Sequence, residues 1–371
     1  MNRKTRLIAL LLAISMMVSA FGAVGLATSN DSLQLGINPS DVISENSALI
    51  LAENPGRSVT AIKSLYDTDE DVIAYCIELS GDGFIVQDIS GEVVEYCLDA
   101  ESPFEAVNAD EKVYITAPMS YFTEDTAGDF VDVYSGETVS KEALDENNAV
   151  QERVEENLAA NDDVAPASPG IMALASYSPP SGSVTASGQT PYTPRNYSYN
   201  PTSICLATAA ATVLVYYDEH INGNIVPSSY ATSSGENLTS WLAARIYPGA
   251  NGSAATYAPK TSNAMSEFMG LYSVGTGVQY STSYVTGTAN TYSMLKSKVA
   301  VGKPIVIVFD GWFADQSVSE LRIVHAVCAY GYRDVMSTNG AKSSYALCID
   351  GWGNTQRYIT SSYLTAASYL S

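Results

Sequence analysis

A long uncharged run limits what the second half of the chain can fold into. Residues 200–218 read NPTSICLATAAATVLVYYD, and small or apolar side chains continue without a charge from position 204 to 217. An Ala-rich run of this length favours a buried helix. Turn and capping residues flank it, namely Asn200-Pro201, Thr202 or Ser203, and Asn222-Gly223. The sequence therefore predicts a core helix whose first turn contains Cys205.

Cys205 is a candidate nucleophile because of its place in that first turn. Unpaired N–H groups and the helix dipole favour the thiolate, which is the reactive form of sulfur. The alternative is a buried cysteine that acts as a small hydrophobic side chain, which is the commoner role of a cysteine considered alone. The rest of the chain has to decide between these two interpretations.

The first 27 residues have the three parts of a secretory signal. Basic residues open the segment, an apolar stretch of 12 residues runs from Leu7 to Val18, and small residues follow. The apolar stretch is too short for a stable membrane anchor. We therefore expect residues 1–27 to be a signal peptide and the protein to be secreted.

Charge divides the chain into two unequal parts. The net charge is −22; residues 1–175 hold 31 Asp and Glu against 8 Lys and Arg, whereas residues 176–371 hold 9 against 10. This asymmetry predicts two units with different roles. An acidic chain without a basic patch also argues against nucleic acid as a partner.

Residues 28–158 are expected to form an acidic, β-rich unit. Turn dipeptides such as Gly81-Asp82 and Ser90-Gly91 separate β-branched and aromatic runs between residues 60 and 99, a pattern typical of hairpins. A further strand is expected at 113–116, and the stretch 141–158 is polar and weakly helical. The many carboxylates form no cluster that looks catalytic and indicate a solvated acidic face.

Residues 159–191 are expected to be a linker, because Ala, Ser, Pro, Gly and Thr dominate them. Exposed linkers of this kind are where proteases cut. Residues 192–371 then open with helices and close with an antiparallel sheet, an α+β order. After the Cys205 helix, the expected helices are 238–246, 264–272 and 292–301. The expected strands are 305–309, 323–332, 344–350 and 356–360.

The chain has only two histidines, so the base that serves Cys205 is one of these two. His220 lies at the end of the predicted helix, where a polar or positive group complements the dipole, so we expect a structural role for it. His325 lies in an otherwise apolar strand, and Asp350 ends the next strand. A thiolate needs a base that also reprotonates the leaving amine, and a third group fixes the tautomer of that base. Cys205, His325 and Asp350 supply these roles in order, at a long Cys-to-His separation.

Five cysteines in an exported chain leave at least one without an intrachain partner, and Cys205 is our choice. Strand alternation places Cys328 and Cys348 on opposite faces of their sheet, so both are expected to be buried thiols. Whether Cys76 and Cys97 pair stays open. The chain has no Cys/His cluster with metal-ligand spacing and no Gly-rich phosphate loop, so we expect no metal and no organic cofactor.

Four segments of the second half resemble papain-like cysteine peptidases of the C39-like, staphopain and streptopain group: ICLATAAATVLVYYDEHINGN, GKPIVIVF, VHAVCAYGY and YALCIDGWGN. The resemblance spans residues 192–371 and implies a papain-like peptidase domain that acts on a protein or peptide. In that family the third triad member lies in an Asn-Ser-Trp-Gly sequence, where the Trp shields its hydrogen bond to His. Asp350 stands at the position of the Asn, and Trp352 at that of the Trp.

Residues 60–100, with their GDGFIVQD hairpin, resemble the β-rich propeptide of streptopain-like enzymes. That propeptide covers the active site until it is removed. The resemblance therefore implies that the acidic unit, residues 28–158, is a pro-region that acts as an intramolecular inhibitor.

The oxyanion donors depart from the family pattern. Many relatives carry Gly directly after the catalytic Cys and a Gln about six residues before it, whereas this chain has Leu206 and Tyr199 at those positions. The backbone N–H of Cys205 supplies one donor. Candidates for the second donor are Gln189, Asn196 and Asn200.

These patterns favour a secreted cysteine endopeptidase that is made as a zymogen-like precursor and uses a Cys-His-Asp triad. Two alternatives stay open. One is a catalytically impaired C39-like secreted binding or surface protein, which Leu206 and the displaced Gln favour. The other is a cell-wall amidase of the Cys/His type, which is disfavoured because such chains usually place His much closer to Cys.

Overall fold

The computed structural model describes residues 42–104, 107–108, 111–145, 148–160, 183–197, 204–248, 254–272, 280–313, 322–336, 340, 342–351 and 356–371. The expected signal at 1–27 lies outside these residues, and so do 161–182, Asn200 and Trp352. In the part of the chain that is described, no helix is long and apolar enough to cross a membrane.

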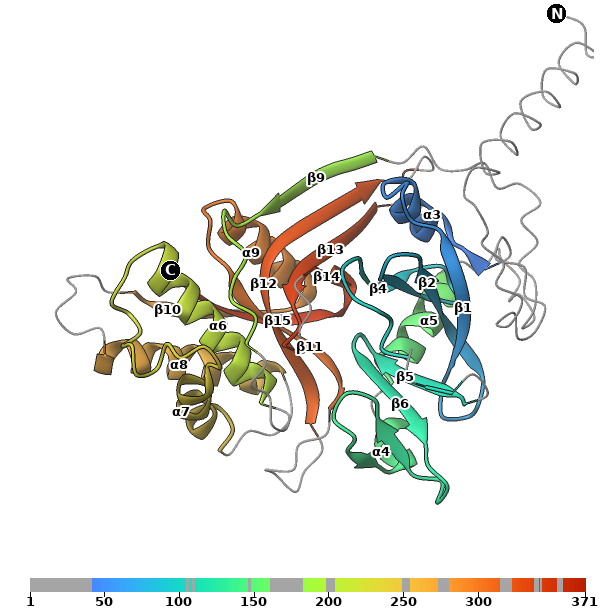
Figure 1. The fold of residues 1–371 in the computed structure, drawn as a ribbon, viewed down its shortest axis with the longest axis horizontal. Coiled ribbons are helices and arrows are strands. Elements are labelled where there is room, and N and C mark those ends of the chain that lie inside the picture. The colour runs from blue at the N-terminus through green and yellow to red at the C-terminus, as the bar shows by residue number, and fades with distance from the viewer. Residues whose placement is uncertain are drawn as a thin grey trace, which may run out of the picture.

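The N-terminal half is a meander of short strands with helices at both ends (Figure 1). Its helices are α3 (Glu45–Ala52), α4 (Lys141–Asp145) and α5 (Ala149–Ala160). Its strands are β1 (Val59–Tyr66), β2 (Val72–Leu79), β3 (Phe84–Asp88), β4 (Val93–Cys97), β5 (Val113–Ala117), β6 (Ser120–Glu124), β7 (Phe130–Asp132) and β8 (Thr138–Val139). In the β2–β3 turn, Gly81 and Asp82 have φ of 70° and 57°. Positive φ at both central residues fits the twist of the flanking strands, and the predicted hairpin at this turn is confirmed.

The C-terminal half mixes helices with longer strands. Its helices are α6 (Cys205–His220), α7 (Glu236–Ile246), α8 (Ala254–Tyr272) and α9 (Thr288–Val299). Its strands are β9 (Ser183–Gln189), β10 (Thr282–Thr286), β11 (Ile305–Phe313), β12 (Arg322–Met336), β13 (Lys342–Ile349), β14 (Arg357–Thr360) and β15 (Leu364–Leu370). Each helix and strand that the sequence predicts here is present, whereas β9, β10 and β15 were not predicted.

Two predictions about the approach to α6 need correction. Residues 183–189, which the sequence assigns to the linker, form β9 and pair antiparallel with β12. Their Ser- and Gly-rich composition is typical of a linker, but the β12 backbone supplies ladder hydrogen bonds that composition does not reveal. The N-cap of α6 is Ile204, without a side-chain cap hydrogen bond, instead of Thr202 or Ser203.

The central strands of the C-terminal half bury both of their faces. Alternation along β12 sends Ala326 and Cys328 toward a core that α6 shares. Val327 and Ala329 point into the opposite core, to which α9 contributes. Every residue of α6 from Cys205 to Tyr217 is buried. The apolar run of the sequence therefore forms the central helix of one core, as predicted.

One sheet runs through both halves. Within the described residues its order is β10-β15-β11-β12-β13-β14-β4-β3-β2-β1-β5-β6-β7-β8, with β9 paired to β12 beside this path. The halves meet where β4 pairs antiparallel with β14, and Arg357 lies opposite Cys97 there. Next to this pair, the ring of Tyr96 stacks on Tyr358 with centroids 4.4 Å apart. Backbone pairing and aromatic packing together dock the N-terminal half on the C-terminal half.

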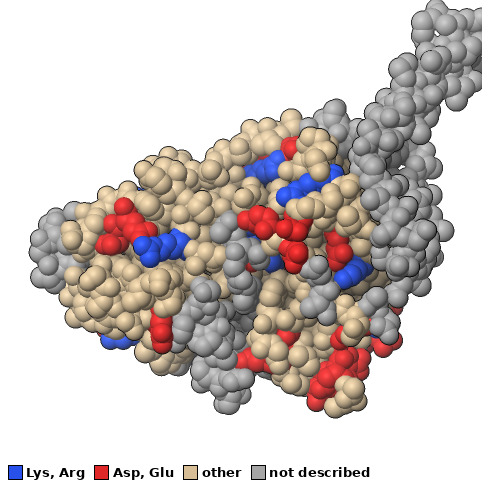
Figure 2. Space-filling view, in the orientation of Figure 1, with Lys and Arg blue, Asp and Glu red and all other residues tan. Residues whose placement is uncertain are grey.

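The unequal charge of the sequence is visible on the surface. On the face drawn in Figure 2, Asp and Glu side chains gather over the N-terminal half, and the C-terminal helices carry fewer charges. Glu95 departs from this pattern, because it is fully buried in β4 beside β14. A carboxylate buried at the junction of the two halves needs a partner, and that partner belongs to the site described next.

Candidate active site

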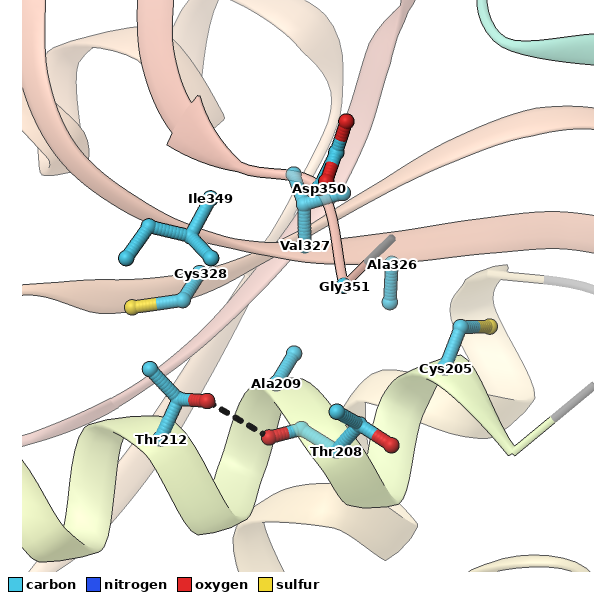
Figure 3. Close-up of a pocket in the computed structure, with 10 residues that line it drawn as sticks. All are labelled: Cys205, Thr208, Ala209, Thr212, Ala326, Val327, Cys328, Ile349, Asp350 and Gly351. Carbon is cyan, nitrogen blue, oxygen red and sulfur yellow. Dashed lines mark hydrogen bonds between the residues drawn. The ribbon is translucent and has the colours of Figure 1, made fainter. Parts of the chain in front are cut away.

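Helix α6 brings Cys205 to a small pocket against β12 and the end of β13 (Figure 3). Cys205 is the first residue of the helix and is 8% exposed. The pocket is lined by Cys205, Thr208, Ala209, Thr212, Ala326, Val327, Cys328, Ile349, Asp350 and Gly351. The space between them is about 10 Å³, which admits roughly one water molecule.

Asp350 directly follows β13 and is buried. Gly351, with φ of 85°, turns the chain immediately after it, in a region that L side chains rarely adopt. In Figure 3 the Asp350 carboxylate points away from α6. Asp350 thus lines the pocket with Cys205 while its charge is directed to the opposite face of the sheet.

His325 lies on β12, directly opposite Phe309 of β11. The two rings meet edge to face, with centroids 5.3 Å apart, and the imidazole is only 1% exposed. Burial, and secondly the positive charge of Arg357, lowers the pKa of His325 to about 3. The ring is therefore neutral near pH 7, and it is next in sequence to Ala326 of the pocket wall.

Asp350 contacts a positive charge that was not among the predicted site residues. The Nε of Arg357 lies 3.2 Å from Oδ2 of Asp350, an ion pair without hydrogen-bond alignment. From the same guanidinium, Nη1 donates to Glu95 Oε1 at 3.1 Å and Nη2 donates to the Tyr134 hydroxyl at 3.1 Å. Tyr121 donates its hydroxyl hydrogen to Glu95 as well. Two unlike carboxylates, one from each half, therefore share one buried guanidinium.

The guanidinium keeps its charge in this setting. Burial on its own lowers the pKa of Arg357, but Tyr134, Glu95 and Asp350 together raise it well above its usual value. The opposite balance holds for Glu95, whose pKa is raised because burial outweighs the favourable charge of Arg357. A sequence signal existed for Glu95, since it interrupts a short apolar strand, whereas Arg357 opens its strand and carries no such signal.

The structure brings two of the three predicted triad members to one pocket, and the third, His325, is not among the residues that line it. Cys205 and Asp350 line the same pocket, and His325 adjoins a third lining residue. Along β12, His325 shares a face with Val327, which points into the core opposite α6, so the His325 side chain lies on the other face of the sheet from the core that contains Cys205. The catalytic roles of the three residues stay predictions at this point.

Gln189, the first candidate for the second oxyanion donor, lies away from the pocket. It is the last residue of β9, is exposed, and pairs with Gly331 of β12. Gly331 is six positions from His325, which corresponds to roughly 20 Å along a strand. Asn196 is half-buried. Asn200, like the proposed shielding Trp352, lies outside the described residues.

His220 is too far from Cys205 to serve it. The two residues end a helix of 16 residues, which is roughly 22 Å long. His220 stacks on the exposed ring of Tyr192 at 4.2 Å, and its Nε2 lies 3.8 Å from a Glu219 carboxylate oxygen. These contacts support the structural role that the sequence predicts for His220.

None of the five cysteines, all of which are described, forms a disulfide. Cys328 lies in the core shared with α6, and Cys348 lies in the opposite core, so their predicted placement on opposite faces is confirmed. Cys76 and Cys97, whose pairing the sequence left open, are buried thiols, and burial raises the pKa of both. Among the described residues, no group of three or more His, Cys, Asp or Glu is placed to hold a metal ion.

The family comparison bears on this half of the chain. The model of the Peptidase_C39 like family matches residues 189–369. Residues 189–369 are therefore similar to the Peptidase_C39-like family. The C39-like segment runs from the end of β9 into β15 and includes Cys205, His325 and Asp350. The match confirms the resemblance read from the sequence motifs and supports a peptidase-like fold.

One solved structure is similar over most of the chain. It is a mutant fragment of prointerpain A from Prevotella intermedia, 13% identical, with a TM-score of 0.38. The alignment covers 83% of this chain and 97% of that chain. No curated protein matches the chain.

Proposed function

We propose that the protein is a secreted cysteine endopeptidase made as a zymogen-like precursor. Cys205 is the nucleophile, His325 the general base and acid, and Asp350 the group that orients the histidine. The observation that carries this proposal is the pocket of the C39-like segment, where Cys205 at the start of α6 meets Asp350 and the strand that bears His325. The substrate is a protein or peptide, and the proposed reaction uses no metal or organic cofactor.

Hydrolysis proceeds by two displacements in this proposal. The sulfur of Cys205 bonds to the peptide carbonyl carbon, and its proton passes to His325. His325 returns that proton to the amine as the C–N bond breaks, which leaves a thioester on Cys205. A water molecule, deprotonated by His325, then hydrolyses the thioester and restores the thiol. The backbone N–H of Cys205 and a second donor, for which Asn196 and Asn200 are the candidates, stabilise the oxyanion.

Three observations support the interpretation of this conformation as a latent one. The pocket admits about one water molecule, the Asp350 carboxylate is paired with Arg357, and His325 is buried and neutral. Residues 28–158, docked through β4, are the proposed inhibitory pro-region. Cleavage in the Pro- and Ser-rich stretch 161–182 is the proposed activating step, because that stretch connects α5 to β9 and has the composition of a linker.

A second candidate function is that of a catalytically impaired C39-like binding or surface protein. Leu206 stands where relatives carry Gly, and Gln189 is exposed and distant from the pocket. Loss of one oxyanion donor slows such enzymes by roughly 100-fold or more. A protein of this kind keeps the fold and loses hydrolysis.

A zymogram separates these functions. Wild-type and Cys205→Ala proteins are run on gels that contain casein or peptidoglycan, before and after cleavage within 161–182. The proposal predicts clearing of casein by the cleaved wild type and none by Cys205→Ala. Clearing of peptidoglycan alone would favour the cell-wall amidase, and no clearing of either gel would favour the binding protein.

A further inference from the structure

Arg357 occupies the seam between the two halves of the molecule. It opens β14, the strand that pairs with β4, and two of its three polar partners come from the N-terminal half. Those partners are Glu95 of β4 and Tyr134, which follows β7. The third partner is Asp350, the proposed orienting residue of the C-terminal half. The guanidinium therefore links the docked pro-region to the candidate site.

The position of Arg357 depends on the docked strands. Its side chain and that of Glu95 are 1% and 0% exposed, and the guanidinium also lies over the ring of Phe84 at 5.3 Å. A buried charge is stable only while its partners remain, and removal of one partner is strongly destabilising. When β4 leaves β14, Arg357 loses Glu95, Tyr134 and the aromatic cover together. Its side chain then gains more from water than from staying beside Asp350.

The docked guanidinium acts on both proposed partners of the thiol. It neutralises the Asp350 carboxylate, and its charge contributes to the lowered pKa of His325. The imidazolium that forms when His325 accepts the Cys205 proton is therefore disfavoured while Arg357 stays in place. Departure of Arg357 frees the carboxylate to face the ring and to stabilise its protonated form.

We propose that Arg357 is a latch: while β4 is paired with β14, Glu95 and Tyr134 hold the guanidinium on Asp350, and release of the N-terminal half frees Asp350 for His325. The inference rests on the proposed function of the site and adds the contact that keeps it inactive. Glu95 is the residue of the pro-region that carries the latch, because it is the only described N-terminal carboxylate paired with Arg357.

The test uses two nearly isosteric substitutions at the same seam. Glu95→Gln keeps an oxygen that can accept from Nη1 of Arg357 but removes the negative charge that faces the guanidinium, so the latch weakens. Glu92→Gln is the matched control, since Glu92 accepts a hydrogen bond from Ser362 at 2.7 Å across the same junction and is not paired with Arg357. In otherwise wild-type full-length protein, Glu95→Gln should speed cleavage within 161–182 about tenfold over Glu92→Gln.

A second readout is independent of activity. The chain contains two histidines, so ring-carbon NMR of full-length protein in a Cys205→Ala background resolves His325, with His220 as internal reference. Glu95→Gln should shift the His325 signal and bring its titration toward the usual range, while Glu92→Gln leaves it unchanged. Tyr134→Phe removes the other N-terminal contact and should act in the same direction, which keeps the test decisive if Glu95→Gln does not fold.

The outcomes separate the latch from the proposed function. Altered His325 signals in Glu95→Gln and Tyr134→Phe support the latch, even if no protein cleaves casein. The absence of casein cleavage would refute the proposed peptidase activity and not the latch. Folded Glu95→Gln and Tyr134→Phe proteins whose His325 signal matches that of Glu92→Gln would overturn the latch, even if the wild type is an active peptidase.

Discussion

The protonation state of His325 decides what the candidate site can do. In the docked conformation the imidazole is buried against Phe309 and stays neutral, because burial and the Arg357 charge both oppose protonation. A neutral ring can accept a proton, but the resulting imidazolium is poorly stabilised there. His325 therefore makes the site a candidate for catalysis, but in this conformation its burial disfavours the imidazolium that catalysis requires.

Replacing each histidine in turn tests the choice of general base. His325→Ala should lower the casein-cleavage rate of processed enzyme by at least about 100-fold, since general acid–base catalysis typically contributes that much. His220→Ala, at the far end of α6, should change the rate less than about twofold. Rates of casein cleavage by the two variants test this choice, and circular dichroism checks that both variants are folded. The opposite ranking would mean that the wrong histidine was chosen.

The lowered pKa of His325 also predicts how stability changes with pH. The pKa of His325 is 6.5 in the unfolded chain, and burial, with the charge of Arg357, lowers this pKa to about 3 in the folded chain. Between these values the unfolded state holds the extra proton, so the free energy of unfolding falls as the pH falls. From pH 7.5 to 5.5 this residue should cost about 1.4 kcal/mol.

Urea unfolding at both pH values measures this cost in the Cys205→Ala background. His325→Gln should reduce the loss of stability between pH 7.5 and 5.5 by about 1.4 kcal/mol, whatever its effect at a single pH. An identical pH dependence in the two proteins would show that His325 is not held neutral in the folded state.

At the scale of helices and strands, what could be predicted followed local chemistry. The β2–β3 hairpin was predictable because Gly81-Asp82 marks its turn, and α6 because its apolar run is long. The strand β9 was missed because its partner, β12, lies far along the chain and its own composition is that of a linker. The latch was missed for the same reason, since Arg357 and Glu95 are 262 positions apart.

The close pairing of β9 with β12 depends on a glycine, Gly331. A Cβ added at Gly331 would lie 2.9 Å from both the Gly188 carbonyl oxygen and Leu347 Cδ2. We therefore expect Gly331→Ala to lower the free energy of unfolding by about 1–3 kcal/mol. Gly270→Ala in α8, where a Cβ meets nothing within 4 Å, is the control and should raise it by up to about 1 kcal/mol. If Gly331→Ala and Gly270→Ala are equally stable in urea, Gly331 is not needed for close pairing of β9 with β12.

At the level of the whole molecule, the N-terminal half belongs to the same sheet as the C-terminal half. The strand pairing of β4 with β14 continues one sheet across the junction, and a hydrophobic cluster includes strands of both halves. Separation of the halves therefore exposes a strand edge and apolar surface at once. This coupling explains how docking of the described part of the N-terminal half can be stable without any covalent bond besides the chain itself.

Self-processing provides a prediction for the intact chain. Wild-type full-length protein should be trimmed within residues 161–182, because its own activity is the proposed source of the cut. Cys205→Ala should accumulate uncut and should be trimmed when a small amount of processed wild type is added. Intact-mass spectrometry follows both proteins. Equal trimming of the two proteins during expression would assign the cut to a host protease.

Covalent trapping tests whether Cys205 is a thiol nucleophile that is served by His325. Processed protein is incubated with a peptidyl epoxide that alkylates cysteine peptidases, and the modified residue is located by peptide mass spectrometry. One equivalent should bind at Cys205, with Cys76, Cys97, Cys328 and Cys348 unmodified, because burial raises the pKa of those four thiols and so disfavours their thiolates. Labelling should fall at least about tenfold in His325→Ala and in the uncut precursor. Labelling spread over the other cysteines would show that Cys205 is not the nucleophile. Labelling of Cys205 in His325→Ala at the wild-type level would show that His325 is not its base.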